Sequence, residues 1–168
     1  MTEIALQPWT EDDLDLLRRA NAPELMVHLG GPETEEQIVA RHRRYVEGDT
    51  FTGQLYSIRL GREPVGTIGY WEKDWQGETV FETGWTVLPE FQRRGIAVAA
   101  TRAVIEEARA AGGCRHLHAF PSVENDGSNG VCRKAGFTLL GTYDFEYPKG
   151  HWMRCNDWGF DLMAVVPV

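Results

Sequence analysis

The chain has 168 residues, 42% of them hydrophobic and 25% charged, with a net charge of −8 at pH 7. This length and composition are typical of one globular domain with its own core, so we expect a single domain over residues 1–168. The negative balance argues against general nucleic-acid binding, which needs a basic surface. It suits a cationic partner such as an amine, although the same charge also serves solubility.

The first residues, Met1-Thr2-Glu3-Ile4, show no basic start and no apolar core, and no apolar run is long enough for a bilayer. We therefore expect a cytoplasmic protein without membrane association. The three cysteines form no Cys-x-x-Cys pair and fit reduced thiols. The pair His116-x-His118 lacks further metal-ligand spacing, so we expect a structural role for it and no metal site.

The N-terminal third predicts a strand and two helices. Residues 3–9 alternate in side-chain character and indicate a strand. Thr10 is placed to cap a helix that Asn21-Ala22-Pro23 stops. Thr34-Glu35-Glu36-Gln37 is a capping box for a second helix that runs to about Glu47.

The middle of the chain predicts three antiparallel strands in series. Residues 54–60 and 65–71 flank a Gly61-Arg62-Glu63-Pro64 turn, residues 71–77 indicate a second turn, and residues 78–87 form the next strand. A helix over 98–111 follows, and then a short strand over 117–120. A strand, a helix and a strand with a crossover of this length predict that the two strands are parallel.

The last third predicts a short helix over 128–135, ended by Gly136, and two final strands over 138–147 and 157–166. Pro148-Lys149-Gly150 is expected to connect these strands as a hairpin.

The loop Gln92-Arg93-Arg94-Gly95-Ile96-Ala97 has the chemistry of an anion site. It lies between a strand and a helix, and the first N–H groups of a helix have no partner inside the helix. The helix dipole adds partial positive charge there, and the two arginines add full charges. Glycine at position 95 lets a ligand approach the backbone closely, so the loop predicts a phosphate site.

Two motifs in this region resemble the GNAT superfamily of N-acetyltransferases. Gln92, Gly95 and Ala97 fill the fixed places of the family's Gln/Arg-x-x-Gly-x-Gly/Ala loop for the coenzyme A pyrophosphate. Downstream, Asn125-x-x-Ser128-x-x-Val131 followed by Lys134-x-Gly136-Phe137 resembles the family's fourth-helix motif. The resemblance covers residues 78–141 best. It is similar to the branch that includes the ribosomal-protein N-terminal acetyltransferases.

The resemblance implies an α/β (α+β) fold, in which a mixed, mostly antiparallel sheet of about seven strands is flanked by helices. A parallel strand pair splays open at the coenzyme site. Acetyl-CoA would be the co-substrate, with no metal. Its pantetheine arm would meet the backbone from Trp85 to Val87, and the Val87 N–H would face the acetyl oxygen. The residues expected at the coenzyme are Trp85, Val87, Gln92, Arg93, Arg94, Gly95, Ile96, Ala97, Asn125 and Ser128. Asn125 is equally well explained as a helix cap.

Three residues are candidates for proton transfer. Glu82 interrupts an apolar strand, where burial would raise its pKa toward a working range for a general base. Glu146, on the penultimate predicted strand, is a second candidate base. Ser128 takes the place of an acid near the sulfur, as in the resembled branch, or caps its own helix. Many family members carry a tyrosine where this chain has Cys132, which we expect to be a packed side chain.

We therefore expect an N-acetyltransferase in which a primary amine attacks the thioester directly. The acceptor is a small-molecule amine or a protein N-terminus. The alternative is a non-catalytic acyl-CoA-binding sensor or interaction module on the same fold. A homodimer through the last strands is compatible with the fold.

Overall fold

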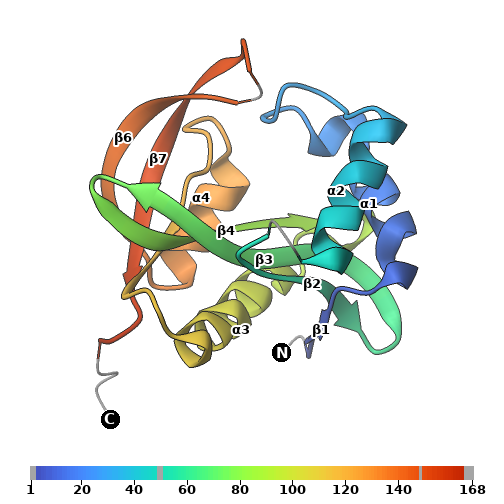
Figure 1. The fold of residues 1–168 in the computed structure, drawn as a ribbon, viewed down its shortest axis with the longest axis horizontal. Helices are drawn as coiled ribbons and strands as arrows, with labels where there is room; N and C mark the ends of the chain where they lie inside the picture. Colours follow the sequence, from blue (N-terminus) through green and yellow to red (C-terminus); the bar gives the residue numbers. More distant parts are fainter. Residues whose placement is uncertain (1–2, 49–50, 148, 165–168) are drawn as a thin grey trace.

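The computed structural model describes residues 3–48, 51–147 and 149–164. Within them a seven-stranded sheet has the order β1-β2-β3-β4-β5-β7-β6 (Figure 1). Neighbouring strands pair antiparallel except β4 and β5, which are parallel, so the predicted mixed sheet is confirmed. The strands are β1 Ala5–Pro8, β2 Gly53–Leu60, β3 Glu63–Trp75, β4 Glu78–Val87, β5 His116–Ala119, β6 Thr138–Glu146 and β7 Trp152–Asp161.

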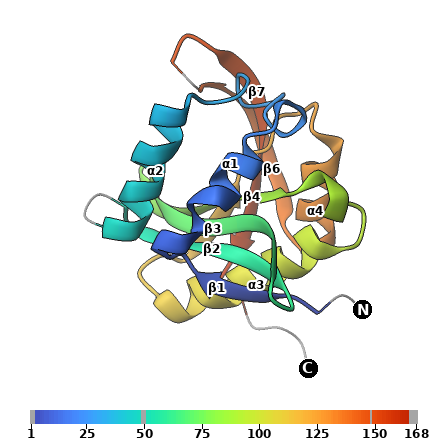
Figure 2. The ribbon, with the colours of Figure 1, turned by 90° about the vertical axis from the view of Figure 1, so that its right-hand side faces the viewer.

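Helices cover both faces of this sheet. The α-helices are α1 Leu14–Ala20, α2 Glu35–Glu47, α3 Ile96–Ala111 and α4 Asp126–Lys134, and short 3-10 turns are η1 Glu11–Asp13, η2 Pro23–Leu25 and η3 Pro89–Phe91. Figure 2 shows α1 and α2 on one side of the sheet and α3 on the other. The buried residues of α3 recur at helical spacing, at Ile96, Ala100, Val104 and Ala108, because one stripe of the helix packs on the sheet. No helix of the described ranges is long and apolar enough to cross a membrane.

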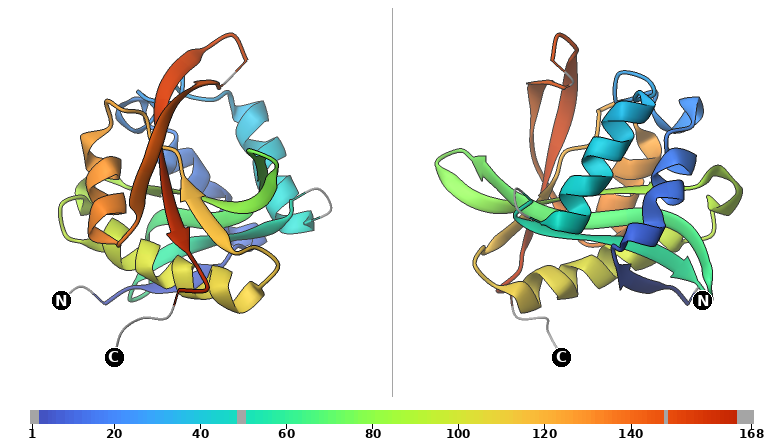
Figure 3. Two further views of the ribbon diagram at one scale, coloured as in Figure 1. Left: turned by 90° about the vertical axis from the view of Figure 1, so that its left-hand side faces the viewer. Right: turned by 45° about the vertical axis from the view of Figure 1, so that its right-hand side comes forward.

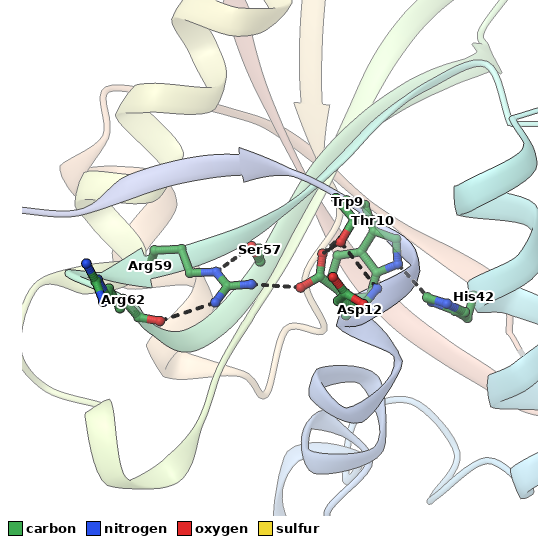
Figure 4. A network of polar contacts seen from close by, with 8 residues as sticks. Trp9, Thr10, Asp12, His42, Ser57, Arg59 and Arg62 are labelled. Carbon is green, nitrogen blue, oxygen red and sulfur yellow. Dashed lines mark hydrogen bonds and ion pairs between the residues drawn. The ribbon is translucent and has the colours of Figure 1, made fainter.

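A polar network fixes α1 and α2 over their face of the sheet (Figure 4). The predicted cap at Thr10 is confirmed as a capping box with Asp13, whose carboxylate is 3% exposed and accepts from Arg59 at 2.8 Å. The Trp9 indole N–H donates to Nδ1 of His42 on α2 at 3.0 Å. The buried Asp13 carboxylate is paired with Arg59, so the start of α1 is held to β2.

Two element boundaries differ from the predictions. The segment expected as a turn over 71–77 continues β3 to Trp75, since its polar residues alternate and pair with Phe81, Val80 and Thr79 of β4. The last strand was expected over 157–166, but β7 begins at Trp152 and ends at Asp161. Arginine and asparagine at positions 154 and 156 hid its first half, and residues 165–166 lie outside the described ranges.

The β6–β7 hairpin leaves the plane of the sheet. The register between the two strands shifts at Leu139/Gly141, and such an irregularity bends a strand pair. In Figure 3 the hairpin rises on the side of the sheet that carries α1 and α2. Side chains of β4, β5 and β7 that point to this side therefore lie between the hairpin and the two helices.

Candidate functional site

Strand β4 runs on alone beyond its parallel partner. The two strands pair only at Phe81↔Leu117 and Glu82↔His118, whereas β4 continues to Val87. On the side of β5, residues 83–87 therefore have no neighbouring strand among the described residues. This is the splayed parallel pair that was predicted, and it leaves backbone groups of β4 available to a ligand.

The pairing with β3 shows which backbone groups these are. The Leu88 N–H donates to the Val65 carbonyl at 2.9 Å, and the preceding residue, Val87, lies opposite Gly66. In an antiparallel pair the residues alternate between bonding the partner and pointing away from it. The N–H and C=O groups of Val87 and Trp85 thus point toward the open side. The Val87 carbonyl accepts from the Gln92 side chain at 3.0 Å, and the Val87 N–H remains on that side.

The loop after β4 brings the start of α3 to the same place. Gly95 is the N-cap of α3 with φ 77°, in the left-handed region that favours glycine, and no side chain caps the helix. Arg93 also has positive φ, at 63°. A Cβ at Gly95 would meet no protein atom within 4 Å. The glycine therefore serves the backbone conformation and the space in front of it, and the amides of residues 96–98 open the helix without intrahelical partners.

A cleft of about 510 Å³ lies where the end of β4, the start of α3 and α4 meet. It also touches the segment from Glu24 to His28. Most of the predicted coenzyme residues line this cleft: Trp85, Val87, Gln92, Arg93, Gly95, Ile96, Ala97, Asn125 and Ser128. Lys134 on α4 lines it as well and adds a second cation. Backbone donors, a helix N-terminus and two cations in one cleft fit a phosphate group.

Arg94 lies apart from the other predicted coenzyme residues. Its guanidinium sits 5.5 Å from the centre of the Phe91 ring, and it is not among the residues that line the cleft. A cation over an aromatic face is a favourable contact. The contact ties the loop to the core residue Phe91, so in this structure Arg94 shapes the loop.

Helix α4 supplies the opposite wall of the cleft. The Asn125 side chain accepts from the Ser128 N–H at 3.1 Å and caps the helix, while Asn125 also lines the cleft. Ser128 does not cap its own helix, and its hydroxyl makes no hydrogen bond within the described residues. Cys132 is fully buried, and burial raises the pKa of its thiol to about 12. A thiol with that pKa is a packed side chain and no acid at neutral pH.

The side chains of Glu82 and Trp85 lie on opposite faces of β4. Glu82 is opposite His118, in the last pair between β4 and β5. Its side chain is 23% exposed, and Oε1 accepts from the Trp71 indole N–H at 3.0 Å. Lys73 Nζ is 3.9 Å away. Burial raises the pKa of Glu82, and Lys73, the indole N–H and His118 oppose that rise. A carboxylate with a raised pKa and residual exposure has the properties of a general base.

The structure does not bring Glu146 to this group. Glu146 is the last residue of β6, is exposed, and lies opposite Trp152 of β7. Its neighbours Phe145 and Tyr143 both pack on Trp75. Because side chains alternate along a strand, Glu146 points away from the face that carries those rings.

Sequence reasoning missed a set of buried polar residues around Glu82 and α4. Asp157 on β7 is 1% exposed, and its carboxylate accepts from Trp75 Nε1 at 3.1 Å and bonds His118 Nδ1 at 2.6 Å. Asn129 donates to the carbonyls of Ser122 and Asn125 and accepts from Trp158 Nε1 at 2.8 Å. The one available signal was a polar residue inside an apolar strand, as at His118. Trp75 packs among the rings of Phe120, Tyr143 and Phe145.

No group of three or more metal-ligating side chains occurs in the part of the chain that the structure describes.

Comparison with known proteins gives one family and many similar folds. The family model of the acetyltransferase (GNAT) domain matches residues 3–138. No curated protein matches the sequence. Among solved structures, aminoglycoside acetyltransferase AAC(6')-Ib in complex with coenzyme A has a TM-score of 0.77 at 19% identity, with 95% of each chain covered.

Two further solved structures are as similar. RimL, a ribosomal L7/L12 alpha-N-protein acetyltransferase in complex with coenzyme A, has a TM-score of 0.77 at 18% identity, covering 96% of this chain and 95% of its own. A GNAT-family acetyltransferase from Bacillus anthracis has a TM-score of 0.78 at 19% identity, covering 98% of each chain. At these identities the likeness shows a common fold.

Proposed function

Because the chain belongs to the acetyltransferase (GNAT) domain family, we propose that it transfers the acetyl group of acetyl-CoA to a primary amine by direct attack. One observation carries the proposal. The unpaired end of β4 and the uncapped N-terminus of α3 meet in one cleft, where backbone N–H groups and two cations converge.

Different residues of the cleft bind different parts of the coenzyme. The pyrophosphate lies at the N–H groups of residues 95–98, where the helix dipole and the cations Arg93 and Lys134 favour an anion. The pantetheine arm runs along β4 and bonds the free backbone groups of Trp85 and Val87. When bound, acetyl-CoA supplies the acetyl group as an activated thioester. The Val87 N–H faces the carbonyl oxygen, where negative charge develops during attack.

Glu82 removes the proton of the amine. It lies on the face of β4 opposite Trp85, between the hairpin and the α1–α2 side, and burial raises its pKa, which strengthens it as a base. Ser128 lines the coenzyme cleft with a hydroxyl that no described residue engages, so it hydrogen-bonds the departing thiolate. Holding the two substrates in line supplies much of the remaining rate.

The acceptor is a small-molecule amine or the N-terminus of a protein. The aromatic surroundings of Glu82 already hold a cation of the protein itself: Lys73 Nζ lies 3.9 Å from Glu82 and 5.3 and 5.5 Å from the centres of the Phe120 and Phe145 rings. The net charge of −8 favours the approach of a cation. AAC(6')-Ib and RimL represent the two acceptor classes by their names, an aminoglycoside and a ribosomal protein.

The buried Cys132 in place of the family's tyrosine keeps a second candidate, a non-catalytic acyl-CoA sensor, in view.

Turnover separates the enzyme from the sensor. Acetyl-CoA is incubated with the protein and a panel of aminoglycosides, amino acids, polyamines and short peptides with free N-termini, and free thiol and acetylated product are measured by absorbance and mass spectrometry. The proposal expects thiol release that depends on the amine and matches product. Coenzyme binding without release from any amine would favour the sensor. Absence of coenzyme binding would contradict both.

A further inference from the structure

A buried histidine–aspartate pair lies next to the proposed base. His118 is 6% exposed and Asp157 1% exposed, and His118 Nδ1 and Asp157 Oδ1 are 2.6 Å apart. The other carboxylate oxygen accepts from Trp75 Nε1 at 3.1 Å. Since a carboxylate only accepts, Nδ1 carries the proton of this bond. Nε2 is then the nitrogen that can gain or lose a proton, and no described residue hydrogen-bonds it.

The pair and the base share one face of the sheet. Glu82 and His118 are opposite each other in the parallel register of β4 and β5, and neighbouring strands lie about 4.8 Å apart. Asp157 of β7 bonds His118, Glu82 of β4 lies opposite it in the register, and the ring of His116 on its own strand is 6.3 Å away. The next titratable side chains lie against these groups: Lys73 of β3 and Cys155 of β7 interact with Glu82, Glu78 of β4 bonds His116, and Tyr143 of β6 packs on Trp75.

This arrangement answers a need of the proposed reaction. Glu82 is 23% exposed, and an acceptor bound beside it would cover the exposed part. A proton taken from the amine then has no direct way to water. His118 is the neighbouring group that can accept it, and Asp157 would stabilise the imidazolium that forms.

We propose that His118, held by Asp157, passes on the proton that Glu82 takes from the amine. The N–H bond of the amine breaks and an O–H bond forms on Glu82. That bond breaks in turn as Nε2 of His118 is protonated, so Glu82 becomes a carboxylate again and the imidazolium pairs with Asp157. When the product leaves and uncovers Glu82, the proton returns to Glu82 and from there to water. His118 acts through Glu82 and does not touch the substrate. The inference rests on the proposed acetyl transfer.

The test compares two histidines of one strand. His116 lies on the same face of β5 as His118 and also bonds a carboxylate, Glu78, at 2.9 Å, but it is partly exposed. His118→Asn keeps a donor toward Asp157 and removes the titrating ring. We expect His118→Asn to lower kcat about 10- to 100-fold, with both KM values within about twofold of the wild type, and to change the pH profile of kcat. His116→Asn should leave kcat, both KM values and the pH profile as in the wild type.

Two further variants separate proton transfer from structure. Asp157→Asn reverses the tautomer of His118 and is expected to lower kcat as much as His118→Asn, while the double variant falls no further. Imidazole added to His118→Ala is expected to restore part of kcat and to leave the wild type unchanged. A His118→Asn enzyme with wild-type kcat and pH profile, or additive losses without imidazole rescue, would overturn this inference alone. A wild type that binds coenzyme but acetylates no amine would overturn the proposed function with it.

Discussion

The two sides of β4 build their sites from different parts of the chain. On the coenzyme side, the donors are backbone N–H groups at the end of β4 and the start of α3, and they lie within residues 85–98. On the other side, the polar groups are side chains of Lys73, Glu82, His118 and Asp157, which come from four strands. The first site is local in sequence, and the second exists only once the sheet has formed.

Because one side uses backbone groups and the other uses side chains, the two sides of β4 should respond differently to substitutions. A backbone site depends on a conformation, so a substitution harms it by adding a side chain in the wrong place. A side-chain site depends on a particular functional group, so an isosteric replacement is enough to disable it. The following predictions test this comparison, from the largest expected effect to the smallest.

Removing the base should have the largest effect. Glu82→Gln keeps an acceptor for the Trp71 indole N–H and loses the proton acceptor. We expect kcat to fall about 10²- to 10⁴-fold with the best amine, and coenzyme affinity to stay within about twofold. Steady-state kinetics and calorimetric titration measure the two quantities. Equal activity of the variant would remove Glu82 from the mechanism.

Adding a side chain should damage the coenzyme side. Gly95→Val places an isopropyl group in the space where the phosphate is expected, and affinity for coenzyme A should fall roughly 100-fold, about 2.7 kcal/mol. Gly48→Val is the matched control. Gly48 also has φ near 70°, caps α2 at its C-terminus and has open space around its Cβ position.

Both glycine variants carry backbone strain of about 1–2 kcal/mol, but only Gly95→Val should lose binding. Equal affinity of the two variants would show that the phosphate lies elsewhere.

Asn129 of α4, which bonds Asn156 and Trp158 of β7, should matter for stability. Asn129→Ala leaves the Trp158 indole N–H and the Asn156 side-chain N–H without the acceptor that they share, while the carbonyls of Ser122 and Asn125 keep their backbone donors. We expect the free energy of unfolding to fall by about 2–3 kcal/mol in urea titrations. Thr142→Ala removes an exposed hydrogen bond of similar length to Asn156 and should cost under about 0.5 kcal/mol. Similar losses of unfolding free energy in Asn129→Ala and Thr142→Ala would refute this role of Asn129.

The hydroxyl of Ser128 should have a smaller effect on rate. Ser128→Ala removes a group that lines the cleft, and kcat should fall about 10-fold, which corresponds to about 1.4 kcal/mol. The melting temperature should not change, because Asn125 caps α4 through the Ser128 backbone. Unchanged kcat would leave thiolate release to water and the backbone.

The smallest effect concerns stability against pH. Burial raises the pKa of Glu82, so the folded chain binds this proton more tightly than the unfolded chain. Stability from this group is therefore fully present below the unfolded pKa and is lost as pH rises through the folded pKa. Glutamine does not titrate. The melting temperature of Glu82→Gln relative to wild type should thus rise between pH 4 and pH 7, and a falling difference would contradict the assigned direction.

The sequence could predict most of the residues that line the cleft, for a physical reason. Gly95 and Ala97 follow a strand and open a helix, and each of these signals acts over a few residues. The network around His118 depends on the register of β5 with β4 and β7, which no local pattern encodes. Asp157 was expected only as the start of a strand. Glu146 was expected as a second candidate base, although alternation along β6 turns it away from Glu82. The role of Asn125 as a cap was readable, because Asn is a favoured N-cap residue.

The most direct test of the account follows the backbone amides of the coenzyme side. Residue-resolved NMR amide shifts are recorded on the ¹⁵N-labelled protein with and without coenzyme A. The account predicts the largest changes at the N–H groups of Trp85, Val87 and residues 95–98, and small changes at Glu82 and His118 on the other face. Changes centred on the Glu82 face, or spread evenly over the chain without a maximum at the start of α3, would contradict it.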